Sequence, residues 1–255
     1  MRRSMINAFQ VLLIASAALV SASPSFAQFG PPPAPQGPAR DIAPIDLTGQ
    51  WVSIVTEDWR FRMVTPEKGD YPGLPLTPAG KAVADAWDPA KDEADGNECR
   101  SYGAPALMRV PGRVRISWKD ASTLEIQADA GRQTRLLHFG DMPAAGAEPS
   151  WQGVSHAEWV FQGGGRGRPP TNGSLKVVTT GLKEGYLHKN GVPYSSDAVL
   201  TEYFDLLHEP DGSQWLVVKA IVDDLKYYTQ SPITSSNFRK QKDRSGWDPE
   251  PCTAR

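Results

Sequence analysis

Two residues combine an ionisable side chain with a setting that suits acid–base chemistry, Glu202 and His188. Glu202 lies in an alternating segment, 198–208, on its more apolar face, together with Ala198, Leu200, Phe204, Leu206 and His208. An isolated charge on a buried face is prohibitively costly, so this carboxylate must be paired, hydrogen-bonded or protonated. Glu202 is therefore a candidate acid, base or ligand-binding group.

Arg135 is the expected partner of Glu202. It shares a face with Leu137 and Phe139 in the alternating segment 133–139. A Glu202–Arg135 pair inside a barrel would satisfy both charges. Two interpretations stay open: a structural ion pair, or two pocket groups that contact a ligand.

A second candidate cluster is the segment EDWRFRM, residues 57–63, which we expect to continue the first strand. Such a strand has two different faces, with Trp59, Phe61 and Met63 opposite Arg60 and Arg62. Aromatic rings beside guanidinium groups suit a planar, anionic or carbonyl-bearing ligand through stacking and bidentate hydrogen bonds. Trp59 and Arg62 are the predicted ligand contacts. The alternative is a core stripe with solvated arginines behind it.

His188 lies in a long segment, residues 180–196, with Tyr186 and Tyr194. A loop that carries such side chains at the mouth of a barrel is typical of a lid or ligand contact. These three residues are predicted ligand-binding residues, and the alternative for His188 is a solvated loop histidine.

Other motifs predict no metal site and no cofactor. None of the four histidines has HExxH spacing. His156 and Glu158 could chelate a metal, but they oppose Trp159 and are expected to face solvent. The glycine-rich segment 163–168 has no strand–helix context, so we interpret it as a mobile hairpin connection rather than a phosphate loop. The chain has no GxSxG, which argues against a serine hydrolase.

The start of the chain predicts export. Arg2 and Arg3 precede an apolar run from Val11 to Val20, and Ser25-Phe26-Ala27 has the form that signal peptidase accepts. We expect residues 1–27 to be a cleaved signal peptide, because the apolar run is about half the ~20 residues that a membrane span needs. The mature chain is then periplasmic or secreted, with no transmembrane segment.

Two cysteines, Cys99 and Cys252, fall in the part expected to be exported. In an oxidising compartment they most simply form one disulfide. A catalytic thiol is the alternative, although neither cysteine has a histidine nearby in the sequence.

Composition argues against some partners. The chain has 27 Lys and Arg against 29 Asp and Glu, and removal of residues 1–27 takes away two arginines and no acids. The mature net charge is then about −4, and no basic stripe stands out. This argues against nucleic acid and against docking on anionic lipid, and leaves a small molecule as the expected partner.

The candidate residues lie mainly in predicted strands of a single domain. Residues 28–45 are proline-rich and are expected to be a disordered, solvated tail, before a single domain over 46–255. Within it, Thr77 and Pro78 begin one short helix that ends at Asp88-Pro89. Period-2 alternation predicts strands elsewhere, at about 113–119, 123–127, 133–139, 155–162, 174–180, 198–208, 214–222 and 233–240. So many hairpin-connected strands favour a closed, antiparallel up-and-down barrel, with a β-sandwich as the alternative.

The mature chain also resembles a family of exported, β-rich bacterial proteins over nearly all of residues 46–252. The resemblance rests on DLTGQWVSIVTEDWRFRMVTPEKGDYPGLPL, ADAWDPAKDEADGNECRSYGAPALMRVPGR, DAGRQTRLLHF, WQGVSHAEW, KNGVPYSSDAVLTEYF and VDDLKYYTQSPITSS. It implies a lipocalin-like barrel, in agreement with the Gly49-x-Trp51 step at the start of the first strand. It carries over no catalytic residue.

Three function classes remain. The first is an exported barrel that binds a small apolar or aromatic molecule. The second is an enzyme on the same barrel, a lyase, isomerase or hydratase that uses Glu202 or His188 as acid or base. The third is an envelope structural protein. A filled barrel interior would favour the third class.

Overall fold

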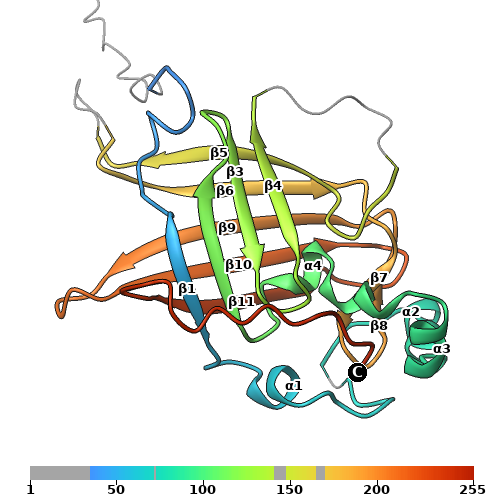
Figure 1. Ribbon diagram of the computed structural model, residues 1–255. Coiled ribbons are helices and arrows are strands. Elements are labelled where there is room, and N and C mark those ends of the chain that lie inside the picture. The colour runs from blue at the N-terminus through green and yellow to red at the C-terminus, as the bar shows by residue number, and fades with distance from the viewer. Residues whose placement is uncertain (1–34, 72, 141–147, 165–169) are drawn as a thin grey trace, which may run out of the picture. The chain divides into compact units, whose positions relative to one another are not determined.

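Within the described residues, nine strands close into a barrel (Figure 1). The computed structural model describes residues 35–71, 73–140, 148–164 and 170–255; the predicted signal peptide and most of the glycine-rich segment lie outside them. Around the barrel the order is β1-β11-β10-β9-β6-β5-β4-β3-β2. The closure confirms the predicted barrel and excludes the sandwich, whereas a lipocalin-like relationship stays a prediction.

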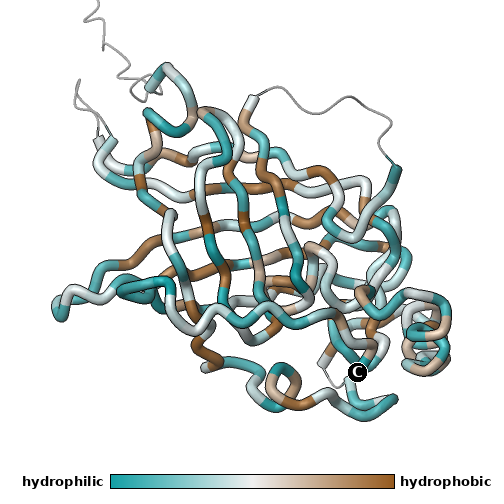
Figure 2. Tube along the Cα trace, in the orientation of Figure 1, coloured by the Kyte–Doolittle hydropathy of each residue, from teal (hydrophilic) through white to brown (hydrophobic). Residues whose placement is uncertain are grey.

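The strands lie close to the positions that alternation predicted. Their bounds are β1 (Gly49–Ile54), β2 (Arg113–Trp118), β3 (Thr123–Ala128), β4 (Thr134–Phe139), β5 (Val154–Gln162), β6 (Asn172–Thr180), β9 (Val199–His208), β10 (Gln214–Asp223) and β11 (Ile233–Lys240). Apolar and polar residues alternate along them in Figure 2. Val114 and Ile116 of β2 are buried, while Arg113 and Arg115, which alternate with them, are only half-buried, because successive side chains point to opposite faces.

Large side chains occupy the barrel interior. Trp51 is fully buried, and its Nε1 donates a hydrogen bond to the Leu47 carbonyl oxygen at 3.0 Å. Phe204 of β9 and Phe238 of β11 belong to the same apolar cluster. This core holds the strands in one register, because a slip by one residue would turn every apolar side chain outward.

The expectation of a purely antiparallel barrel is wrong at one pair of strands. β4 and β5 run parallel, with Leu137 opposite Ser155 and Phe139 opposite Ala157. Parallel neighbours need a longer crossover than a hairpin turn, and residues 140–153 separate these two strands in the sequence. A small hairpin, β7 (Gly185–His188) and β8 (Val192–Tyr194), is inserted between β6 and β9.

The expectation of one helix is also wrong. The predicted helix is α2 (Pro78–Asp85), and Thr77 caps it, since Thr77 Oγ1 accepts a hydrogen bond from the Gly80 N–H at 3.1 Å. Asp88 does not end the helical region but caps α3, because its Oδ1 accepts from the Ala90 N–H at 3.1 Å. The remaining helical elements are α1 (Trp59–Met63), α3 (Pro89–Ala94), η1 (Glu98–Tyr102) and α4 (Ala104–Leu107).

Part of the segment expected to be a solvated tail lies against the barrel. Ala39 and Ile45 are buried, and the Ala39 carbonyl oxygen accepts a hydrogen bond from Trp159 Nε1 at 2.8 Å. In Figure 1 α2, α3, the β7–β8 hairpin and the C-terminus lie at the lower right, and α1 lies below the strands. None of the helices in the described part of the chain is long and apolar enough to cross a membrane.

Candidate functional site

The ion pair expected from the sequence lies inside the barrel. Arg135 Nη2 is 2.6 Å from Glu202 Oε2, and Arg135 Nη1 is 3.1 Å from Glu202 Oε1. Arg135 Nη2 also donates to Thr179 Oγ1 at 3.3 Å. Both charged residues are about 1% exposed, and Arg135 Nε is buried without a hydrogen-bond partner among the described residues. The two short contacts favour the structural ion pair over a pair of ligand-binding groups.

The segment 57–63 is not the continuation of β1. The chain turns at Asp58, whose φ is 48°, and enters the one-turn helix α1. Helical periodicity replaces the expected strand faces: Trp59 is 65% exposed and Met63 is 59% exposed, whereas the Arg62 side chain is 1% exposed. Of the two predicted contacts here, the structure therefore buries Arg62 and leaves Trp59 on the surface.

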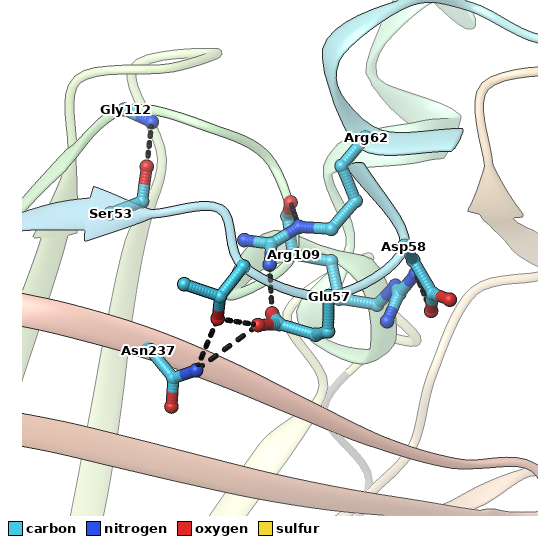
Figure 3. Close-up of polar contacts among 8 residues, drawn as sticks. Ser53, Glu57, Asp58, Arg62, Arg109, Gly112 and Asn237 are labelled. Carbon is cyan, nitrogen blue, oxygen red and sulfur yellow. Dashed lines mark hydrogen bonds and ion pairs between the residues drawn. The ribbon is translucent and has the colours of Figure 1, made fainter. Parts of the chain in front are cut away.

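Arg62 is held from two directions, as Figure 3 shows. Its Nε donates to the Arg109 carbonyl oxygen at 2.8 Å, and its Nη1 forms an ion pair with Glu57 Oε1. The second Glu57 oxygen accepts from Asn237 Nδ2 of β11 at 3.1 Å. Burial and the nearby Arg109 charge lower the pKa of Arg62, although Glu57 and Asp58 oppose them.

A second buried arginine, Arg109, follows α4 and was missed by the sequence analysis. It is 6% exposed, and its Nη2 donates to Asp58 Oδ2 at 3.1 Å. The signal was present, because Arg109 stands in the apolar run APALMRV, residues 104–110. A single arginine in such a run is a buried charge that requires a partner.

Both arginines line a cavity of about 290 Å³ outside the barrel strands. Its walls come from α1, η1, α4, β7 and the C-terminal segment 250–253. Phe61, Ala106, Val110 and Leu187 supply apolar surface, and His188, Lys189 and Tyr102 supply polar groups. Neither Glu202 nor Arg135 lines this cavity.

His188 stands between this cavity and a second one of about 490 Å³, which Asp58, Phe61 and Tyr71 also line. Its ring stacks on Phe61, with centroids 6.3 Å apart and planes at 18°. Burial, helped by the Arg109 charge and opposed by Asp58, lowers the pKa of His188 to about 4. The imidazole is therefore neutral at pH 7 and offers one donor and one acceptor.

Three polar atoms of these cavity-lining residues lack hydrogen-bond partners. Arg62 Nη2, Arg109 Nη1 and His188 Nδ1 each expose less than 1 Å², and none has a partner among the described residues. A buried polar group without a partner costs about 1–3 kcal/mol. Such groups in a native fold call for a water, an ion or a ligand that completes them.

The C-terminal wall of the cavity is held covalently. Cys99 and Cys252 form a disulfide, as predicted, although they are 153 residues apart in the sequence. Lys189 Nζ donates to Tyr102 Oη at 2.7 Å and to Thr253 Oγ1 at 3.2 Å, so the same wall is also tied to β7.

The other predicted contact residues lie elsewhere. Tyr186 is 5% exposed, and its hydroxyl donates to Asp92 Oδ2 at 3.0 Å. Tyr194 is fully buried, and its hydroxyl packs against Gly103 and Gly185. Burial raises the pKa of both tyrosines. Neither residue lines the cavity.

His156 and Glu158, the two residues that could chelate a metal, are both on β5. Glu158 is exposed and pairs with Lys176 at 2.7 Å. Across the described ranges, no group of three or more His, Cys, Asp or Glu side chains is arranged to hold a metal ion.

No model of a protein family, no curated protein and no solved structure matches this chain. The resemblance to exported bacterial proteins therefore stays a prediction, and function is inferred from the geometry of the site.

Proposed function

We propose that this chain is an exported barrel that binds a small, largely apolar or aromatic molecule in the cavity between α1, α4 and β7. The observation that carries the proposal is the set of three enclosed, unpartnered polar atoms, Arg62 Nη2, Arg109 Nη1 and His188 Nδ1, on residues that line one cavity. A ligand with acceptor and donor atoms in reach of these groups would supply the hydrogen bonds that the protein itself does not provide.

The apolar lining supports the same proposal. Phe61, Val110 and Leu187 offer a surface for a hydrocarbon or ring, and a few convergent polar groups beside such a surface are typical of small-molecule sites. The barrel interior is occupied by Trp51, Phe204 and other core residues. The proposed ligand site is therefore the cavity between α1, α4 and β7 rather than the middle of the barrel.

An enzyme is the less favoured class. A general acid or base works best with a pKa near the operating pH, and the pKa of His188 is about 4. Glu202 is engaged with Arg135 and lines neither cavity described above. The filled barrel interior favours the third class, an envelope structural protein, and the cavity outside the strands is the observation that favours a binding protein instead.

Export is the second part of the proposal. The Cys99–Cys252 disulfide supports it, because disulfides persist in oxidising compartments. Intact-mass analysis of protein from the envelope fraction should find a mature chain that begins at Gln28. An exported chain that retains residues 1–27 would contradict the predicted signal peptide.

Mass spectrometry under native conditions tests ligand binding. Protein purified from its native envelope should carry a co-purifying small molecule. Val110→Trp, which adds an indole at the cavity wall, should reduce its amount without lowering the melting temperature. Val160→Trp, at a position 36% exposed on β5, is the matched control and should retain the molecule. Equal loading of wild type and Val110→Trp would overturn this site.

A further inference from the structure

We propose that the ligand of this cavity is an amphipathic anion, a carboxylate on an aromatic body, whose acid group is bound by Arg62 and Arg109. This inference rests on the proposed function and adds the chemical class of the ligand.

The unpartnered arginine atoms are donors. Arg62 Nη2 and Arg109 Nη1 carry N–H groups that have no acceptor among the described residues. A guanidinium group donates and never accepts, so the complementary ligand atom must be an acceptor. The Arg62 Nε donates to the Arg109 backbone carbonyl oxygen at 2.8 Å, so the two residues are neighbours. A carboxylate has two acceptor oxygens, which is enough for one N–H from each arginine.

The charges around the arginines favour an anion over a neutral carbonyl. Glu57 pairs with Arg62 and Asp58 with Arg109, but the acids are the more solvated partners. The Glu57 and Asp58 side chains are 26% and 53% exposed, against 1% and 7% for the arginine side chains. Water screens the acids more than the arginines, so the acids offset the arginine charges only in part.

Observations at three further residues favour a positive potential in the cavity. Lys189 lines it and has no carboxylate within ion-pair distance in the described part of the chain, because its Nζ contacts Tyr102 and Thr253. The acid on that wall, Glu250, is exposed to solvent. At His188, the Arg109 charge lowers the pKa more than Asp58 raises it.

The other residues that line the cavity indicate that the part of the ligand beyond its acid group is aromatic. Phe61 and His188 are stacked and both line the cavity, so they offer aromatic surface to a planar ring. Val110 and Leu187 add aliphatic surface. An inorganic anion would leave this surface without a partner, whereas an aromatic acid uses both parts of the site.

The test compares 2-naphthoate with 2-naphthamide, which have the same ring and differ in charge. Fluorescence titration of the wild-type protein should give a dissociation constant for the naphthoate at least about tenfold lower than for the amide. Arg109→Met should weaken naphthoate binding by about tenfold or more and change naphthamide binding by less than about twofold. Arg239→Met is the matched control and should change neither constant, since Arg239 pairs with Asp211 and does not line this cavity.

The outcomes separate the two proposals. If both probes bind wild type equally, or if Arg109→Met leaves the naphthoate preference intact, the anion inference is overturned while the cavity stands. If neither probe binds, the proposed function itself fails. Thermal melts monitor folding, and Lys189→Met serves as a second variant that also should lower the preference for naphthoate, because Lys189 is half-buried and outside the Arg–Glu and Arg–Asp pairs.

Discussion

Arg135 of β4 and Glu202 of β9 are 67 residues apart in the sequence and form a two-pronged ion pair inside the barrel. Each residue is about 1% exposed, so neither charge is solvated by bulk water. Such a pair adds little over apolar packing, but the loss of one partner leaves an uncompensated buried charge.

Glu202→Gln should therefore destabilise the protein strongly. The substitution keeps the shape of the side chain and leaves the Arg135 guanidinium without its counter-charge, at a cost of about 3–5 kcal/mol. Urea unfolding of the variant measures the change in the free energy of unfolding.

Arg135→Met and the double variant Glu202→Gln, Arg135→Met complete a double-mutant cycle. The double variant should lose clearly less stability than the sum of the two single losses, because it removes both charges together. Small, additive effects would contradict a structural role for the pair.

Removal of the disulfide should lower stability by about 2–5 kcal/mol. Cys99 and Cys252 are 153 residues apart, so they close a long loop, and they anchor the C-terminal wall of the cavity. Unfolding of the wild type with and without a thiol reductant measures the effect. The Cys99→Ser, Cys252→Ser double variant should not respond to the reductant. Equal stability of wild type and double variant would show that the disulfide is dispensable.

Stability should fall as the pH falls below about 6.5, in part because of His188. The folded pKa is about 4 and lies below the ordinary value of 6.5, so between these values the unfolded chain binds a proton that the folded chain excludes. The contribution of His188 to the free energy of unfolding is up to about 3 kcal/mol. It is fully present above pH 6.5 and is lost as the pH approaches 4.

Thermal melts at several pH values between 7.5 and 4 check this dependence. His188→Gln should remove part of the slope, since glutamine does not titrate. His208→Gln, at an exposed residue of β9, is the control and should keep the wild-type slope. An unchanged slope in His188→Gln would mean that His188 is protonated as easily in the fold as in the unfolded chain.

Gly191→Ala should destabilise more than Gly212→Ala. Both glycines have a φ near +80°, at 84° and 80°, so the backbone cost of a side chain is similar, about 1 kcal/mol. A Cβ at Gly191 would lie 2.2 Å from the Trp87 Cβ, whereas a Cβ at Gly212 meets nothing within 4 Å. Melting temperatures of the two variants isolate the cost of the steric clash, and equal losses would contradict this close packing.

The sequence alone determined most of the strands, one helix and the disulfide. Alternation at 113–118 and 199–208 is a local property, because side chains two residues apart share a face whatever the strand pairs with. The Thr77 cap and Pro78 are equally local. Two cysteines allow only one intramolecular pairing, so the disulfide followed from the sequence. A carboxylate on an apolar face requires a partner, and this requirement predicted the pair of Glu202 with Arg135.

Tertiary structure decided the direction of β5, the helix α1 and the site. Alternation carries no strand direction, so the parallel pairing of β4 and β5 was not visible in it. The pattern of residues 59–63 fits a strand or one helical turn, and the left-handed turn at Asp58 selects the helix and buries Arg62. Arg109 and His188 meet Arg62 only because α4, β7 and α1 pack together, and contacts between distant segments leave no local period in the sequence.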